Sequence, residues 1–234
     1  GYCDDTSWQD YSSGSIVVSP NDEFTVGVAA CLNEEEIASP SRLNTTNTSS
    51  TPHTLNLNDC NLDCLPLGLL ANVALGNVSH IVARRNLFTH LGIDNRNNVV
   101  IPQRLEAVQI IDVDQNNIVS IAPTFLTNAK VLIRFSAVGN FLTQITTPLF
   151  ATTTSLKVLT LDDNNIVNIF ADAFNALSKL THLSLTNNEL RSVADDTLTL
   201  CTLLMFLSLD NNFITELPAD LLSTTTLLEE FHIR

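Results

Sequence analysis

The chain has 234 residues, 44% of them hydrophobic, and carries a formal net charge of −14 with only 11 lysine and arginine residues. Because nucleic-acid binding requires a basic surface that displaces phosphate counterions, this balance argues against nucleic acid as a partner. No apolar stretch approaches the length of a membrane span, so we expect a folded chain with a sizeable core and no span in this segment.

The first 51 residues contain two short predicted strands. The segments SIVVS and FTVGVAACL are rich in β-branched residues, and the turn-forming sequence PND lies between them. Residues 39–54 are polar and rich in serine and threonine. Such a segment cannot contribute to a core, so we expect an exposed loop there.

Cysteines and glycosylation motifs in the same part of the chain favour the secretory route. Four of the five cysteines fall within the first 64 residues, as expected if disulfides stabilise one end of an oxidised protein: Cys3, Cys31, Cys60 and Cys64. The spacing favours Cys3 with Cys31 and Cys60 with Cys64, one of the three connectivities that four cysteines allow. Three glycosylation motifs begin at Asn44, Asn47 and Asn77. The chain opens on Gly1 without an initiating methionine, which fits removal of a signal sequence.

From residue 108 onward one pattern, LxxLxLxxNxI, recurs every 24 residues. Five consecutive copies keep this register without an insertion, which indicates a repeat architecture. The first copy consists of Val108, Ile111, Val113, Asn116 and Ile118, and the later copies begin at Leu132, Leu156, Leu180 and Leu204.

The pattern is looser at both ends of this region. Upstream, copies begin at Leu55 and Val78, Cys60 stands in the asparagine position, and extra residues are expected to bulge at 94–99. Downstream, Leu228, Phe231 and Ile233 begin a further copy that the chain does not finish. Because an uncovered parallel edge would invite association, we expect more chain, or another molecule, to cover it.

The repeat has a direct physical reading. Alternation within LxxLxL buries two aliphatic residues and turns the one between them outward. Parallel stacking of such strands, about 4.8 Å apart, makes a continuous core. The asparagine column lies where each strand turns away, and its amides can both donate to and accept from buried turn amides. A second apolar column recurs at Leu126, Phe150, Phe174, Leu198 and Leu222, and Cys201 falls in an inward position as a buried small residue.

This pattern resembles the leucine-rich-repeat family, in its 24-residue extracellular class, over residues 52–234. The resemblance implies an α/β solenoid with a curved parallel β-sheet on a concave face, and loops and short helical turns on a convex face. It implies about seven repeats and an unfinished eighth, preceded by an N-terminal cap with a glycosylated loop at residues 1–51. The usual tight cysteine cluster of such caps is absent. Protein binding without a cofactor is the function that the family implies.

The outward strand positions form the surface that a protein or glycoprotein ligand would contact. They mix hydroxyl, acidic and aromatic side chains, which suits a protein partner, although an idle polar surface would look similar. The candidate ligand-binding residues are Asp112, Asp114, Arg134, Ser136, Thr160, Asp162, His182, Ser184, Phe206, Ser208 and Asp210. Charge reversal at Asp162 and Asp210 is expected to weaken the partner without lowering stability.

Catalysis and metal binding fit the same residues poorly. His182 and Ser184 share a face but lie roughly 6.6 Å apart along a strand, and no glycine-rich elbow accompanies them. Asp114, Asp162 and Asp210 lie two strands apart, roughly 9 to 10 Å, which is too far for one calcium ion. The five histidines show no ligand spacing. We therefore expect neither an enzyme nor a metal site.

Two functional readings remain open at this point. The first is a recognition ectodomain, secreted or displayed at the cell surface. The second is a structural subunit of an extracellular wall, sheath or filament, which the uncovered C-terminal edge and possible end-on self-association would favour.

Overall fold

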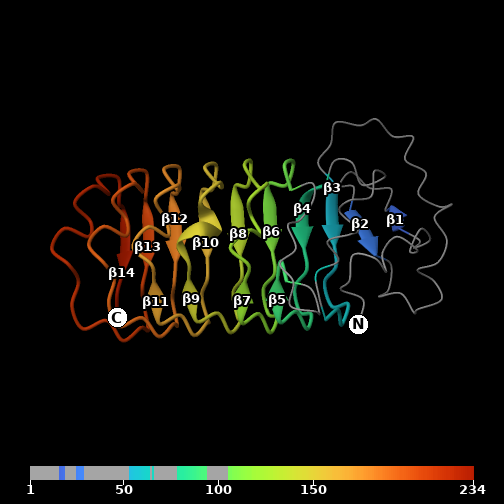
Figure 1. Cartoon of the computed structure of the whole chain (residues 1–234), viewed down its shortest axis with the longest axis horizontal. Helices are drawn as coiled ribbons and strands as arrows, with labels where there is room; N and C mark the ends of the chain where they lie inside the picture. Colours follow the sequence, from blue (N-terminus) through green and yellow to red (C-terminus); the bar gives the residue numbers. More distant parts are fainter. Residues whose placement is uncertain (1–15, 19–24, 29–52, 64, 66–77, 94–104) are drawn as a thin grey trace.

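The strands of this chain stand side by side in one long row (Figure 1). The structure is a computed structural model that describes residues 16–18, 25–28, 53–63, 65, 78–93 and 105–234. The expected disulfide partners Cys3, Cys31 and Cys64, the motifs at Asn44, Asn47 and Asn77, and the bulge at 94–99 lie outside the described residues. The disulfide pairing, the glycosylation and the cap boundary therefore stay predictions.

Among the described residues, one sheet of ten strands has the order β1-β2-β3-β4-β6-β8-β10-β12-β13-β14. Its first pair, β1 and β2, is antiparallel, and every later pair is parallel. The bounds are β1 Ile16–Val18, β2 Thr25–Val28, β3 His53–Asn56, β4 Val78–Val82, β6 Ile110–Asp112, β8 Arg134–Ser136, β10 Val158–Thr160, β12 His182–Ser184, β13 Phe206–Ser208 and β14 Glu230–His232. The two strands expected near the N-terminus are thus present.

The register confirms the 24-residue repeat. Leu159 pairs with Leu183, and Leu183 pairs with Leu207, so residues 24 apart lie on neighbouring strands. All three side chains are buried. Because equivalent leucines superpose from strand to strand, the stack excludes water and forms a continuous core, and the solenoid expected from the sequence is confirmed.

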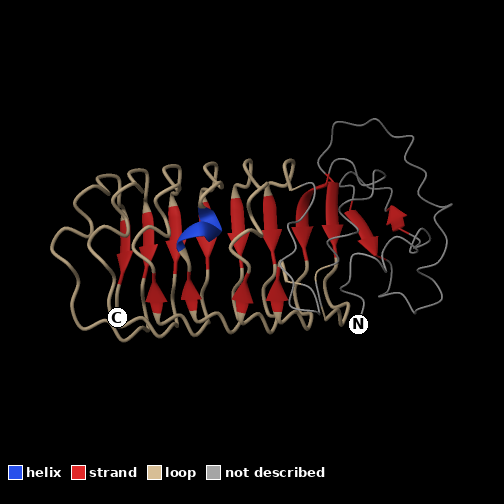
Figure 2. Cartoon of the chain, in the orientation of Figure 1, coloured by secondary structure: helices blue, strands red, loops and turns tan. Residues whose placement is uncertain are grey.

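The opposite side of each turn carries shorter strands joined by loops (Figure 2). β5 (His90–Leu91) pairs with β7 (Ser120–Ile121), and β9 (Gln144–Ile145) pairs with β11 (Asn168–Ile169). A short 3-10 helix, η3 (Thr147–Phe150), follows β9, and Pro148 lies in its first turn, where a missing N–H costs nothing. Loops and one helical turn therefore form the convex side of the described chain.

A phenylalanine spine runs beneath the convex side. The ring of Phe150 lies 6.0 Å from that of Phe135 and 6.3 Å from that of Phe174, measured between centroids. Leu126 and Leu198 continue the column and are buried as predicted, whereas Leu222 is partly buried. Cys201 is also buried, as expected, and burial raises the pKa of its thiol to about 12, so the thiol stays protonated.

The asparagine ladder connects each repeat to the one before it. Asn164 donates from Nδ2 to the carbonyls of Ala137, Leu161 and Asp162 at 2.9 to 3.1 Å, and its Oδ1 accepts the N–H of Leu142 at 2.9 Å. Equivalent bonds are made by Asn86, Asn116, Asn140, Asn188 and Asn212. The predicted structural role of this column is confirmed.

A column of left-handed backbone precedes the ladder. Positive φ angles of 52° to 67° recur two residues after the main strands, in the order Asp59, Arg85, Gln115, Gly139, Asp163, Asn187 and Asn211, with Asn61 nearby. Glycine, asparagine and aspartate tolerate this conformation, whereas arginine and glutamine do so at a cost. The turn therefore fixes the same conformation in every repeat, whatever residue occupies it.

Candidate functional site

The concave face is the outer surface of the ten-stranded sheet, made by alternate residues of each strand and of the two positions that follow it. Some of the eleven residues expected to bind a ligand are hidden on this face. Asp112, Ser136, Ser184 and Ser208 are exposed by 9% or less, because neighbouring strands flank their short side chains. Arg134 and His182 are exposed, and Asp114, Thr160, Asp162, Phe206 and Asp210 are half-buried. The two groups offer very different surfaces to a partner.

Aspartate alternates with other residues in the column that follows the strands: Asp114, Val138, Asp162, Thr186 and Asp210. The first of these carboxylates is bonded within the protein. Asp114 Oδ1 accepts the Ser136 hydroxyl at 2.6 Å and the Val138 N–H at 2.8 Å. Burial raises the pKa of Asp114 above its ordinary value, and these two hydrogen bonds oppose the shift.

Asp162 repeats this arrangement two strands further on. Its Oδ1 accepts the Thr186 N–H at 2.8 Å, and the Ser184 hydroxyl donates to the same carboxyl group. Burial again raises the pKa of Asp162, partly offset by these bonds. A charge reversal at Asp162 would therefore break internal contacts as well as any contact with a ligand, so the expected harmless reversal does not fit this residue.

The N-terminal half of the face is tied into what we call the closed network, which consists of Arg84, Asp112, Asp114, Ser136 and Thr160. The Arg84 guanidinium donates to Asp112 Oδ2, with Nε at 2.8 Å, and its Nε lies 3.9 Å from Asp114 Oδ2. Thr160 donates to Ser136 Oγ at 2.8 Å. These bonds satisfy the polar groups internally and raise the pKa of Arg84, so they leave little for a partner to bind.

The C-terminal half carries an open cluster, defined as His182, Phe206, Asp210, Glu230 and His232. The His182 and Phe206 rings stack with centroids 5.9 Å apart and planes 22° from parallel, and the His232 ring lies 5.4 Å from Phe206 at 40°. His232 Nε2 is 3.5 Å from Glu230 Oε2, and its Nδ1 is 4.0 Å from Asp210 Oδ2. Three rings and two carboxylates thus meet on β12, β13 and β14.

Asp210 differs from its two equivalents in the column. Its Oδ1 atom is buried and has no hydrogen-bond partner among the described residues, whereas Oδ1 of Asp114 and of Asp162 is bonded. The serine that donates to the other two is replaced by His232 at the equivalent position. A buried carboxylate oxygen without a donor is costly, so this atom has capacity for an external one.

Comparison with known proteins agrees with the repeat geometry. A family model described as leucine rich repeat matches residues 154–214. The chain is a leucine-rich-repeat protein. A search of curated proteins finds no significant match.

Among solved structures, the leucine-rich repeats are similar to the crystal structure of a TLR13-ssRNA13 complex. The TM-score is 0.62 at 20% sequence identity, with 78% of this chain aligned. The match covers 25% of the length of the TLR13 chain. At this identity the likeness establishes the shared solenoid fold and no more.

The repeats do not assemble a hydrolytic site from the residues weighed for one. His182 Nδ1 bonds to the Thr181 hydroxyl at 2.9 Å, and Ser184 Oγ lies 3.4 Å from Thr186 Oγ1, so the serine and the histidine have separate partners. In the part of the chain that the structure describes, no three His, Cys, Asp or Glu residues come together as a metal site. Across the same residues, no helix has the length and apolar character to cross a membrane.

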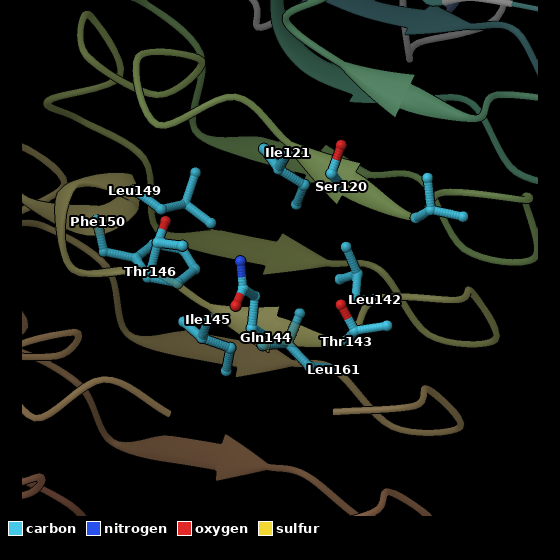
Figure 3. A pocket seen from close by; sticks show the side chains of 11 residues that line it. Ser120, Ile121, Leu142, Thr143, Gln144, Ile145, Thr146, Leu149, Phe150 and Leu161 are labelled. Atoms are coloured by element: carbon cyan, nitrogen blue, oxygen red, sulfur yellow. The ribbon is translucent and has the colours of Figure 1, made fainter. Parts of the chain in front are cut away.

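A small cavity lies on the convex side of the repeats, between β7 and β9. Figure 3 shows Ser120 and Ile121 on one side of it and Gln144 and Ile145 on the other. It lies where the described short strands do not pair, since β7 pairs with β5 and β9 with β11. Its volume of about 80 Å³ has room for a few water molecules, whereas small-molecule sites are typically roughly 300 to 1,000 Å³. The concave face is therefore the better candidate site.

Sequence reasoning selected eleven residues of this face but omitted Arg84, Glu230 and His232. All three lie in the outward columns, so their positions followed from the repeat. What the sequence lacked was a signal for pairing, because Arg84 and Asp112 are 28 residues apart and His232 lies 22 residues from Asp210.

Proposed function

We propose that this chain is a recognition domain that binds a protein ligand through the concave face of its leucine-rich repeats, in an extracellular or cell-surface setting, and that it is not an enzyme. The observation that carries the proposal is the half-exposed aromatic and acidic surface of the open cluster on a stacked, hydrogen-bonded scaffold. Aromatic side chains at the centre of a polar surface are typical of protein interfaces. The separate partners of His182 and Ser184 support the non-enzymatic part.

A screen of the full chain against purified extracellular proteins tests this proposal when it is paired with a blocking variant. Val158 is half-buried on the concave face of β10, outside the open cluster, so Val158→Arg would place a bulky cation in the middle of the face. Ala171→Arg is the matched control, because Ala171 is exposed in a loop between β11 and β12. We expect a ligand to lose at least about tenfold in affinity with the first variant and to bind the second normally. Equal binding to both would refute use of the concave face.

Nucleic acid is a distinct outcome of the same screen, because the structure similar to this one is a complex whose title names ssRNA. On this chain the concave-face cation Arg84 is paired with Asp112, and carboxylates recur along the column from Asp114 to Asp210. Phosphate would meet repulsion there, so we expect no binding of single-stranded RNA at physiological salt. Salt-dependent RNA binding that Val158→Arg alters would replace the protein-ligand proposal.

The extracellular setting rests on the clustered cysteines and the three glycosylation motifs. Expression through a eukaryotic secretory pathway tests it directly. We expect intact mass to fall on enzymatic removal of N-glycans, with modification at Asn44, Asn47 or Asn77, and free thiols to be fewer than five. An unmodified protein with five titratable thiols would contradict this setting.

A further inference from the structure

We propose that the open cluster is a subsite for a basic side chain of the protein ligand, arginine above all, which would lie against the Phe206 ring and bond to Asp210. This inference rests on the proposed function and adds the chemistry of what is bound. It follows from three features of the cluster: the ring faces, the unpartnered carboxylate oxygen and the local charge.

The rings provide a surface on which a planar cation can stack. Phe206 lies between the two histidines, with centroid distances of 5.9 Å to His182 and 5.4 Å to His232. Aromatic faces attract cations within about 6 Å of the ring centroid, and guanidinium groups also stack on them. Phe206 is half-buried and therefore fixed, so the face would not need to be ordered at the moment of binding.

The two carboxylates provide the matching anions. Asp210 is 22% exposed at its side chain and Glu230 is 65% exposed, so one is deep in the cluster and the other lies at its rim. Asp210 Oδ1 has no hydrogen-bond partner in the described chain, and an arginine N–H would supply the donor that Ser136 supplies to Asp114. Guanidinium presents several donors in one plane, whereas an ammonium is a point charge, which is why arginine is favoured over lysine.

The surroundings add to the attraction. Residues 179–234 contain eight acidic side chains, namely Glu189, Asp195, Asp196, Asp210, Glu216, Asp220, Glu229 and Glu230, against three basic ones, namely Lys179, Arg191 and Arg234. Arg234 lies one strand beyond Asp210, and no ion pair between them is formed within the described residues. A basic segment would therefore be drawn to this end of the solenoid and not to the closed network, where Arg84 already occupies the equivalent space.

Peptide titration of the full chain tests the subsite without knowledge of the natural ligand. The probes are three fluorescent glycine–serine peptides that carry two arginines, two lysines or two citrullines, followed by polarisation at physiological salt. Citrulline keeps the planar shape of arginine and lacks its charge. We expect arginine to bind at least about tenfold more tightly than citrulline, with lysine between them.

Variants of the cluster make the test specific. Asp210→Asn and Phe206→Leu are expected to reduce the arginine peptide's affinity about fivefold each. Glu216→Gln removes one exposed carboxylate at a distance from the cluster and is expected to leave the affinity unchanged. Unfolding temperatures of all variants, measured alongside, separate loss of the subsite from loss of the fold. Asp114→Asn serves as a second control, because it removes an equivalent charge in the closed network.

Equal binding of the arginine and citrulline peptides would overturn the proposal. So would equal losses in Asp210→Asn, Asp114→Asn and Glu216→Gln, because that pattern indicates general attraction to an acidic protein. The outcome is separable from that of the proposed function. A protein ligand that Val158→Arg blocks, yet Asp210→Asn and Phe206→Leu leave bound, would keep the concave face as the interface and remove the arginine subsite.

Discussion

Asp114 and Asp210 occupy equivalent positions in repeats that belong to one regular stack, yet their surroundings differ. Asp114 accepts a serine hydroxyl and a backbone N–H, and the Arg84 guanidinium lies nearby. Asp210 faces His232 in place of the serine, and its Oδ1 has no partner in the described chain. The closed network therefore contributes to the stability of the protein itself, whereas the open cluster retains unused bonding capacity. Availability for binding is set by the neighbours of a carboxylate and not by its place in the repeat.

The largest expected effect concerns the ladder that both regions share. Asn116 beside the closed network and Asn188 beside the open cluster each donate to three carbonyls and accept one N–H. Replacement of either by alanine leaves several buried groups unsatisfied, so each should cost about 3 kcal/mol or more in free energy of unfolding. Chemical denaturation of both variants checks this. Clearly unequal losses would show that the two regions differ in their interior as well as on the face.

Removal of the central cation should separate the two regions on the face. Asp112 is almost fully buried beside Arg84, so Arg84→Met would leave its charge without compensation. Allowing for the exposure of Arg84, we expect a loss of about 2 kcal/mol. Asp210→Asn in the open cluster should change stability by less than about 0.5 kcal/mol. The comparison fails if the two variants unfold at the same denaturant concentration.

The left-handed column distinguishes the regions more gently. Gln115 in the N-terminal half has a φ of 54°, and Asn211 in the C-terminal half has a φ of 53°. Gln115→Gly should raise the free energy of unfolding by about 0.5 to 1 kcal/mol because glycine relieves the strain, whereas Asn211→Gly should change it by a few tenths, since asparagine already tolerates this conformation. Gly139→Ala should be destabilising by about 1 kcal/mol through backbone strain alone, because the added Cβ would meet nothing closer than 3.5 Å. Thermal unfolding of the three variants checks the order.

The smallest effect is on the pH dependence of stability. Burial raises the pKa of Asp162 in the folded state, so the folded protein binds this proton more readily than the unfolded chain does. Stability from this group therefore rises as pH falls from neutral through the folded-state pKa, and levels off below the ordinary aspartate value. After allowance for partial exposure, the gain is on the order of a few tenths of a kcal/mol. Asp162→Asn should lose it, while the exposed Asp220→Asn should retain it in unfolding measured from pH 7 to 4. A wild-type gain that persists in Asp162→Asn would assign it elsewhere.

Much of the fold was readable from the sequence because its determinants recur at a fixed interval. Leu159, Leu183 and Leu207 could be aligned by counting, and the asparagine column could be given a structural role, since only an amide both donates and accepts at such a turn. The left-handed column also left a signal that counting would have found: Gly139, Asp163, Asn187 and Asn211 are all residues that tolerate positive φ.

The state of each residue on the concave face was harder to predict. Sequence spacing places Asp112 and Asp210 on the same surface, but their bonding depends on side chains more than 20 residues away. The reach of Arg84 to Asp112 depends on rotamers that the repeat does not fix. The choice of face was thus within reach of sequence reasoning, whereas the division between closed network and open cluster required coordinates.

The alternation of aspartate with other residues along the face has a consequence for how this chain can lengthen or shorten. The interior is invariant to excision of 24 residues, because leucine and asparagine columns would rejoin in register. The face is not, because loss of one module would bring Asp114 onto the strand beside Asp162, with two buried carboxylates about 5 Å apart. Loss of a pair of modules would leave the order of charges intact. For its interior the molecule counts in single modules, and for its surface it counts in twos.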